Sequence, residues 1–327
     1  MSIPLVSIAI ATYNGERFLR KQLDSIYAQS FNNIEVIACD DCSIDSTVSI
    51  LEEYSVMYGL RYYQNNRNLG YVKNFEKLME LCAGEFIALS DQDDIWLPHK
   101  IETMLKHFDQ DTMVVHSDAI LSGEYDEVLE KSYSEASKKV VIPESYIDLI
   151  FNGCVTGCTC MMRADLKRDL LPFPEEINVH DRWIGLLAYS RMGLKYLPEK
   201  LIYYRQHNNN SLGAGINFRK KTGNIAFDLF FRKRKDGLFF HCVGNWGVSK
   251  TIKDRFFSKL GFSQKLKVLL SYYIWKNLSF KKCSLLGVLL LPIFTTYFEK
   301  NKSISLKVKI YIVFIFRSFR KCVGLLE

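Results

Sequence analysis

Short apolar runs and helical spacings alternate along the first part of the chain. Residues 5–11 and 34–39 are apolar and rich in β-branched side chains, which is typical of buried strands. Between them, after a polar break at residues 14–15, apolar side chains recur at the spacing of a helix over residues 18–27. The pattern therefore predicts a strand followed by a helix, and then a second strand.

The same alternation continues to residue 108. It predicts strands at 61–64 and 85–89, and helices around 48–54, 74–81 and 98–108. Four strand–helix units in a row favour an α/β fold with a mostly parallel sheet flanked by helices. Ligands of such sheets bind beyond the carboxyl ends of the strands.

Three of the four predicted strands end in polar clusters. These are residues 12–14 (Thr-Tyr-Asn), Asp40-Asp41, and residues 91–94 (Asp-Gln-Asp-Asp). A parallel sheet would gather them on one rim, which we interpret as a binding site. Ordinary polar turns are the alternative, and it weighs most for the first two clusters.

The third cluster places three carboxylates within four positions, between apolar Leu89 and Ile95-Trp96. Clustered carboxylates repel one another unless they are protonated, solvated or paired with a cation. Oxygen ligands suit Mg²⁺ or Mn²⁺, which also bind phosphate oxygens, so the cluster predicts a divalent metal and a diphosphate ligand. A solvated acidic loop is the alternative, but the flanking apolar residues disfavour it.

The middle of the chain is less regular. We predict strands at 113–116, 158–163 and 195–205, a helix at 180–192, and an exposed polar excursion over 122–139. The nine cysteines are irregularly spaced. Cys39 and Cys42 have CxxC spacing but no second pair at zinc-ribbon distance, and Cys154, Cys158 and Cys160 have no nearby histidine, which favours free thiols over a metal or redox site. The N-terminus has no basic segment or cleavage site of a signal peptide, so we expect a reducing, cytoplasmic location.

Charge divides the chain into two parts. Residues 1–200 hold 19 Lys and Arg against 31 Asp and Glu, whereas residues 201–327 hold 24 against 5. Residues 284–298 and 308–316 are mainly apolar, and each is shorter than the roughly 20 residues that span a bilayer. We therefore expect a basic, amphipathic helical extension that associates with a membrane surface, although helices packed on the main domain are the alternative.

Four motifs resemble family 2 glycosyltransferases of the GT-A fold. They are ATYNG at 11–15, DDCSIDST at 40–47, SDQDDIW at 90–96 and HDRW at 180–183. In addition, YRQHNNNSLGA at 204–214 is similar to bacterial rhamnosyltransferase-like members that build surface polysaccharides. The resemblance implies a Rossmann-like GT-A domain over residues 1–215, followed by the basic C-terminal region over 216–327.

The resemblance also implies a nucleotide site. Ala11, Thr12 and Tyr13 would line the base and ribose of a nucleotide-sugar. Asp40 would accept the N3–H of a uracil or thymine ring, and Asp41 would support it.

Metal and catalytic roles are implied for the remaining motifs. Asp91 would contact the ribose or the metal, Asp93 would bind Mg²⁺ or Mn²⁺ directly, and Asp181 would be the general base. A helix N-cap is the structural alternative for Asp181. Arg205 and His207 lie at a predicted strand end; either can contact the diphosphate, and His207 can be a further metal ligand. A surface ion pair and a plain loop histidine are their alternatives.

The implied function is transfer of one sugar with inversion at the anomeric carbon. The chain lacks the QxxRW pattern of processive synthases, which favours single-sugar addition. We expect dTDP-rhamnose or a UDP-hexose as donor, and a lipid-linked saccharide on the inner face of the cell membrane as acceptor, as in O-antigen or capsule synthesis.

Two other functions remain open at this point. A nucleotidyltransferase acting on sugar phosphates would need a glycine- and lysine-rich loop after the first strand, which ATYNGERF is not. A nucleic-acid-binding module could use the basic tail, but the acidic half would repel phosphates and no recognition signature is present. We therefore expect no nucleic-acid partner.

Overall fold

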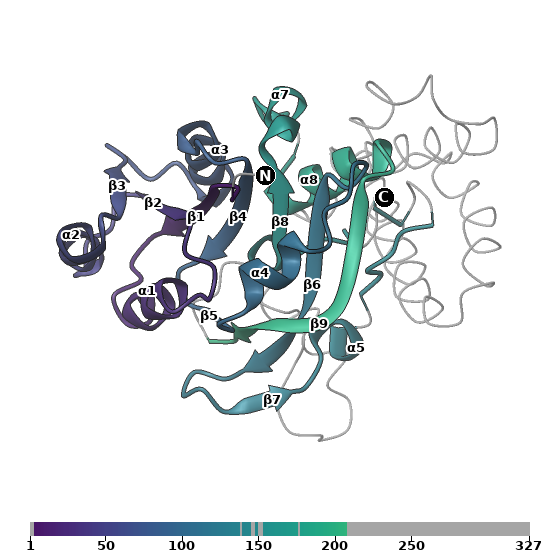
Figure 1. The fold of residues 1–327 in the computed structure, drawn as a ribbon. Coiled ribbons are helices and arrows are strands. Elements are labelled where there is room, and N and C mark those ends of the chain that lie inside the picture. The colour runs from purple at the N-terminus through teal and green to yellow at the C-terminus, as the bar shows by residue number, and fades with distance from the viewer. Residues whose placement is uncertain (1–2, 138, 145–147, 150–152, 176, 208–327) are drawn as a thin grey trace, which may run out of the picture. The chain divides into compact units, whose positions relative to one another are not determined.

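The structure, a computed structural model, describes residues 3–137, 139–144, 148–149, 153–175 and 177–207 (Figure 1). The chain separates into two compact units, Met1–Thr222 and Gly223–Glu327, and all described residues belong to the first. The predicted basic extension at 216–327 and residues 208–215 lie outside the described residues.

The amino-terminal half alternates strands and helices in the predicted order. Its elements are β1 (Val6–Thr12), α1 (Leu19–Tyr27), β2 (Ile34–Asp40), α2 (Thr47–Tyr58), β3 (Arg61–Gln64), α3 (Tyr71–Leu81), β4 (Phe86–Asp91), β5 (Ile95–Trp96) and α4 (Lys100–Leu105). The second half contains β6 (Val114–Ser122), β7 (Val128–Glu130), α5 (Tyr133–Ser137), η1 (Gly157–Thr159), β8 (Cys160–Arg163), η2 (Ala164–Leu166), α7 (Lys167–Leu170), α8 (His180–Ser190) and β9 (Leu194–Arg205).

One mixed sheet joins these strands in the order β3-β2-β1-β4-β8-β6-β9-β5, with β7 beside β6. Strands β1 to β4, β6 and β9 run in one direction, whereas β5, β7 and β8 run in the other. The expectation of a mostly parallel sheet therefore holds for β3-β2-β1-β4 and for the pair β6-β9, but not at the edge, where β5 runs antiparallel to β9. It fails in the middle, where β8 separates β4 from β6.

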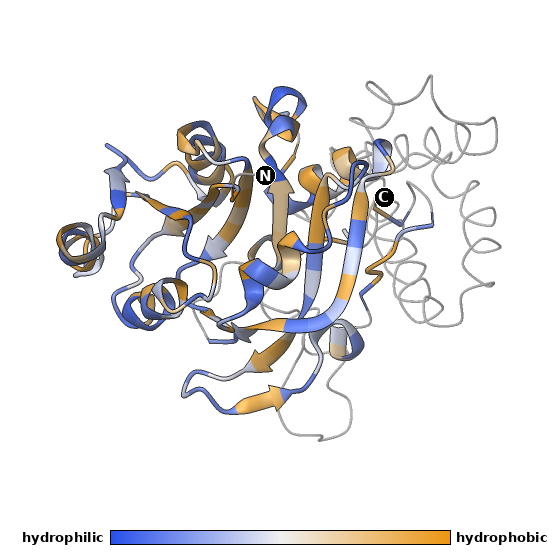
Figure 2. Ribbon diagram, viewed as in Figure 1, coloured by the Kyte–Doolittle hydropathy of each residue, from blue (hydrophilic) through white to orange (hydrophobic). Residues whose placement is uncertain are grey.

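Helices cover both faces of the parallel strands. Right-handed crossovers lead through α1 and α2 toward β3 and return through α3 to β4, so α1 and α3 lie on opposite faces (Figure 1). Helices α1 and α2 carry both hydrophobic and hydrophilic residues (Figure 2). The apolar side of α1 packs on alternate residues of β1, which include Ile8 and Ile10. This packing fixes the ends of the strands relative to one another.

The excursion predicted over 122–139 is partly ordered. It contains β7, which forms a hairpin with β6, and the short helix α5. Strand β6 is also longer than predicted and continues to Ser122. None of the helices that the structure describes has the length and apolar character needed to cross a bilayer.

Candidate active site

Strand register brings the predicted polar clusters together. Thr12 lies opposite Asp40 in the pairing of β1 with β2, and Ala11 lies opposite Asp91 in the pairing of β1 with β4. The carboxyl ends of three adjacent parallel strands therefore share one rim, where ligands of α/β sheets bind.

Asp40 is buried and fully oriented. Its carboxylate accepts hydrogen bonds from the Thr12 hydroxyl (3.0 Å) and from the backbone N–H and the hydroxyl of Ser43 (2.9 Å for the N–H). Three donors compensate for the loss of water around this charge. Asp40 thus links the ends of β1 and β2.

Asp41 anchors the loop that precedes α3, next to the strand-end rim. It accepts hydrogen bonds from the backbone N–H groups of Leu69 (2.7 Å) and Gly70 (2.8 Å), and from the Asn65 amide (2.9 Å). Gly70 has φ +81°, a conformation that favours glycine, so the loop can turn its N–H groups toward the carboxylate. The contacts of Asp41 are those of a support for this loop.

Gln92 connects the first and third clusters, although sequence reasoning did not select it. Its amide oxygen accepts the Tyr13 N–H (2.8 Å), and its amide nitrogen donates to the Tyr13 carbonyl oxygen (3.0 Å). We call this pair of hydrogen bonds the Gln92–Tyr13 clasp. A Cβ on Gly15 would lie 2.2 Å from the Gln92 amide oxygen, so only glycine at position 15 leaves space for the Gln92 side chain. The Tyr13 ring itself is half-exposed.

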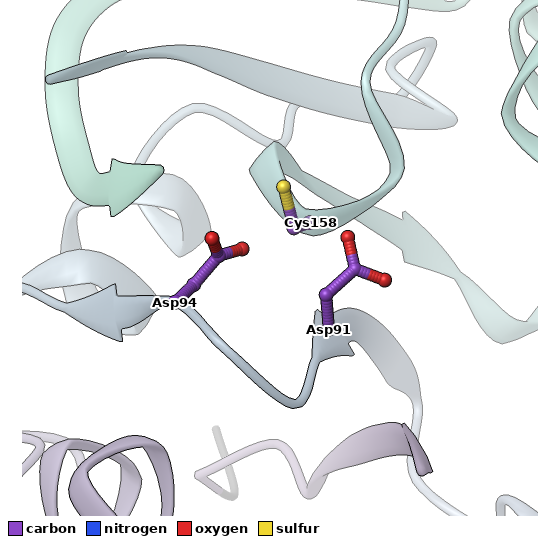
Figure 3. Close-up of side chains that lie close together, drawn as sticks. All are labelled: Asp91, Asp94 and Cys158. Atoms are coloured by element: carbon purple, nitrogen blue, oxygen red, sulfur yellow. The ribbon is translucent and has the colours of Figure 1, made fainter. Parts of the chain in front are cut away.

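The carboxylates of Asp91 and Asp94 point toward the Cys158 thiol (Figure 3). Among the described residues, their ligand atoms form a group of three that lie within 4.8 Å of one another. Burial, together with the charges of Asp93 and Asp181, raises the pKa of Asp91 to about 7. Burial and the charges of Asp93 and Asp91 raise the pKa of Asp94 well above its usual value.

Lys100 places an internal cation beside these acids. The side chain is fully buried, its ammonium donates to the Cys158 carbonyl oxygen (2.7 Å), and it lies 3.7 Å from the centre of the Trp96 ring. Burial lowers its pKa to about 8, against the opposing influence of Cys158, Asp94 and other anionic groups. The ammonium acts on two carboxylates of the cluster, Asp94 and Asp91. Sequence reasoning missed Lys100 because a lysine on a short helix is usually exposed.

Asp93 and His207 meet across the end of β9. His207 Nε2 lies 2.7 Å from Asp93 Oδ2, and the imidazole packs against the Phe18 ring at a centroid distance of 4.8 Å. A carboxylate oxygen and an imidazole nitrogen are both ligands of Mn²⁺, and the oxygen also suits Mg²⁺. These two predicted ligands therefore fit a divalent ion, whereas Asp91 groups with Asp94 and Cys158 instead.

Arg205 differs from the expectation that it contacts a diphosphate or forms a surface ion pair. It is 1% exposed, and its Nε donates to the Asp93 carbonyl oxygen (2.7 Å). Its backbone N–H donates to Asp94 Oδ1 (3.1 Å), and its guanidinium pairs with Asp126 (2.5 Å). Strand β9 turns this side chain inward under the acidic loop, which favours a positioning role.

Asp181 lies in the first turn of α8 and is not the N-cap, which is Val179. The N-cap alternative for Asp181 is therefore wrong. Its Oδ2 accepts the Gly157 N–H (3.3 Å), and its charge raises the pKa of Asp91, which places the two carboxylates within electrostatic range. The carboxylate lies at the N-terminal end of α8, where the helix dipole is positive.

His180 is part of the core. Its ring stacks on Phe75 at 4.1 Å, and burial lowers its pKa to about 4, so the imidazole is neutral at pH 7. Within the described part of the chain, neither ring nitrogen has a hydrogen-bond partner. The described contacts of His180 therefore include no hydrogen bond to Asp181.

Comparison with known proteins defines the class of the protein. The structure of Staphylococcus aureus TarS 1–349 in complex with UDP-GlcNAc superposes with a TM-score of 0.58 at 19% identity, over 83% of this chain and 72% of that one. A mannosyltransferase from Pyrobaculum calidifontis, in complex with GDP-Man and Mn²⁺, gives 0.50 at 16% identity, over 99% and 87%. The fold is the GT-A-like fold of glycosyltransferases.

The family model of glycosyl transferase family 2 matches residues 7–171. The dTDP-rhamnosyl transferase RfbG of Shigella flexneri is 29% identical over 243 residues, which are 68% of this chain and 81% of that protein. The putative glycosyltransferase EpsH of Bacillus subtilis is 32% identical over 222 residues, which are 63% of this chain and 62% of that protein. The chain belongs to glycosyl transferase family 2 and is a glycosyltransferase, so the nucleotidyltransferase and nucleic-acid-binding alternatives lose their support.

Proposed function

We propose that the protein transfers a single sugar from a nucleotide-sugar to a saccharide acceptor, with a divalent metal and inversion at the anomeric carbon. One observation carries the proposal. The Asp93–His207 pair, the Asp91 carboxylate and Asp181 lie at the strand-end rim that Thr12 and Asp40 also line. Such a rim would offer a metal site for the donor diphosphate and a carboxylate base for the acceptor hydroxyl.

The nucleotide would bind across the ends of β1 and β2. Asp40 is held in one orientation by Thr12 and Ser43, so it can accept an N–H from a base without a loss of side-chain entropy. Tyr13 presents a half-exposed ring for stacking, and the Ala11 backbone continues the same surface. Asp41 would act indirectly, through the loop that it anchors.

Asp93 and His207 would hold Mg²⁺ or Mn²⁺, with Asp91 on the same rim for the ribose or the metal. A divalent ion supplies positive charge for the leaving diphosphate. Asp93 is fixed for this role from both sides, since Arg205 holds its backbone carbonyl and His207 contacts its carboxylate. Arg205 would support the metal centre through its hydrogen bond to the Asp93 carbonyl oxygen.

Asp181 would be the general base. As the acceptor oxygen bonds to the anomeric carbon, the bond from that carbon to the diphosphate oxygen breaks, and the hydroxyl proton passes to the Asp181 carboxylate. The Gly157 N–H fixes the orientation of this carboxylate. Attack from the side opposite the leaving group inverts the anomeric centre.

The proposals for the donor, the acceptor and the location of the enzyme rest on similar proteins and on the sequence. The name of the Shigella relative favours dTDP-rhamnose, and the TarS complex keeps a UDP-hexose derivative as the second candidate. A lipid-linked saccharide is the proposed acceptor, as in lipopolysaccharide or other surface polysaccharide biosynthesis. The basic region at 216–327 would associate with the inner face of the cell membrane and keep the enzyme there.

A screen of nucleotide-sugars for Mn²⁺-dependent release of nucleoside diphosphate tests the proposal. Wild-type protein should release diphosphate from one donor in the presence of acceptor lipid. Asp181→Asn should lose on the order of 100-fold or more in turnover but bind the nucleotide as before, because general-base catalysis contributes about that much. Full turnover by this variant would show that Asp181 is not the general base. Release of nucleoside diphosphate at the same rate without a divalent metal would refute the proposed metal requirement.

A further inference from the structure

The turn between β6 and β7, residues 123–127, is built against the end of β9. Arg205 Nη1 donates to the carbonyl oxygens of Gly123 (3.2 Å) and Glu124 (3.4 Å), and the same nitrogen lies 2.5 Å from Asp126 Oδ1. Three groups of one turn therefore converge on a single guanidinium.

Arg205 also contacts the acidic loop on its other side. Its guanidinium Nε donates to the Asp93 carbonyl oxygen at 2.7 Å, and its backbone N–H donates to the Asp94 carboxylate at 3.1 Å. His207 follows two residues later and contacts Asp93 Oδ2. Arg205 thus joins the turn to both residues that would hold the metal.

The Asp126 contact differs from an ordinary surface pair because its Arg205 side is buried, although Asp126 itself is 38% exposed. The Arg205 side chain is 1% exposed, and a buried guanidinium requires a carboxylate and filled hydrogen bonds to remain in place. Asp126 also pairs with Lys21, and Glu124 pairs with Arg17, but both basic partners are more than half exposed. Exposed pairs of this kind contribute little.

We propose that Asp126 is a positioning residue for the metal centre, acting through Arg205 on Asp93 and His207. This inference rests on the proposed function, because it requires Asp93 and His207 to bind the ion. Asp126 lies 33 positions after Asp93 in the sequence, on a segment that the sequence alone marks as an exposed excursion. The turn is in contact with the site, and its conformation affects how tightly the ion is held.

The test compares Asp126→Asn with Glu124→Gln in the full chain, by titration of Mn²⁺ followed by electron paramagnetic resonance. Asparagine suits the left-handed backbone of residue 126 (φ +68°), so this variant removes the charge without strain. Glu124→Gln removes the neighbouring exposed ion pair and leaves the Asp126–Arg205 contact intact. Nucleoside diphosphate binding without metal and thermal unfolding provide the folding controls.

We expect Asp126→Asn to weaken Mn²⁺ binding on the order of 10-fold, as the loss of a supporting contact behind a metal ligand does. The KM for Mn²⁺ should rise by a similar factor, with metal-free nucleotide binding unchanged. Glu124→Gln should bind Mn²⁺ as the wild type does. Equal Mn²⁺ affinity of Asp126→Asn and wild type overturns the positioning role alone, whereas a wild type that binds no Mn²⁺ overturns the metal centre and the positioning role together.

Discussion

Replacing Lys100 by methionine removes the internal cation beside the acidic cluster. Methionine keeps the length and the apolar stem of the side chain but cannot donate to the Cys158 carbonyl oxygen, which Lys100 reaches at 2.7 Å. It also leaves Asp91 and Asp94 without the ammonium that acts on both. The variant therefore tests whether the cluster depends on a cation supplied by the protein.

The expected magnitude follows from two contributions. A buried carbonyl oxygen left without a donor costs about 1–3 kcal/mol. Removing one partner of a buried charge group costs about 3–5 kcal/mol in all, because the remaining charge loses its compensation. Protonation of Asp91, whose pKa is already about 7, lets the variant avoid part of this cost. We expect a loss of about 3 kcal/mol in the free energy of unfolding at pH 7.

Urea denaturation followed by circular dichroism measures this loss, with Lys106→Met as the matched control. Lys106 lies one residue beyond α4, and its pair with Glu102 is exposed on both sides and contributes little to stability. Added Mn²⁺ should recover part of the stability of Lys100→Met, since a second cation then balances the acids. A Lys100→Met variant as stable as Lys106→Met would refute a structural role for the ammonium.

Three further predictions follow from the site. Gly15→Ala should weaken nucleotide binding several-fold because the new methyl group displaces Gln92 from Tyr13, with the loss of two hydrogen bonds worth about 1 kcal/mol each; isothermal titration with nucleoside diphosphate measures this. The folded-state pKa of His180 is lowered to about 4, below its unfolded value, so stability should fall by up to about 3 kcal/mol as the pH drops from 6.5 to 4, and a His180→Gln variant should show a flatter dependence in urea titrations. Asp93→Asn should abolish Mn²⁺-dependent turnover but retain metal-free nucleotide binding; unchanged activity in Mn²⁺ would exclude Asp93 as a ligand.

The rim was predictable because few topologies are compatible with four successive strand–helix units. Once β1, β2 and β4 are parallel neighbours, Thr12, Asp40 and Asp91 must end at the same edge. The motifs then located Asp181, which lies more than 80 residues from the acidic cluster, and the structure places its charge within range of Asp91. These features depend on local patterns that a sequence displays directly.

Other features depend on packing between distant segments. Strand β8 has four residues and follows the 3₁₀ turn η1, so its reversed direction leaves no periodic signal in the sequence. Lys100 and Arg205 look like surface residues because their types usually are, and only the surrounding structure shows both to be buried. The clasp between Gln92 and Tyr13 joins residues 79 positions apart, and no pattern within either segment indicates it.

A crystal structure of the protein with Mn²⁺ and a nucleoside diphosphate tests the central claim most directly. We predict the ion on Asp93 Oδ2 and His207 Nε2, the diphosphate next to it, and the base beside Thr12 and Asp40. An ion bound elsewhere, with the Asp93–His207 contact retained and the nucleotide away from the strand ends, would contradict the proposed site.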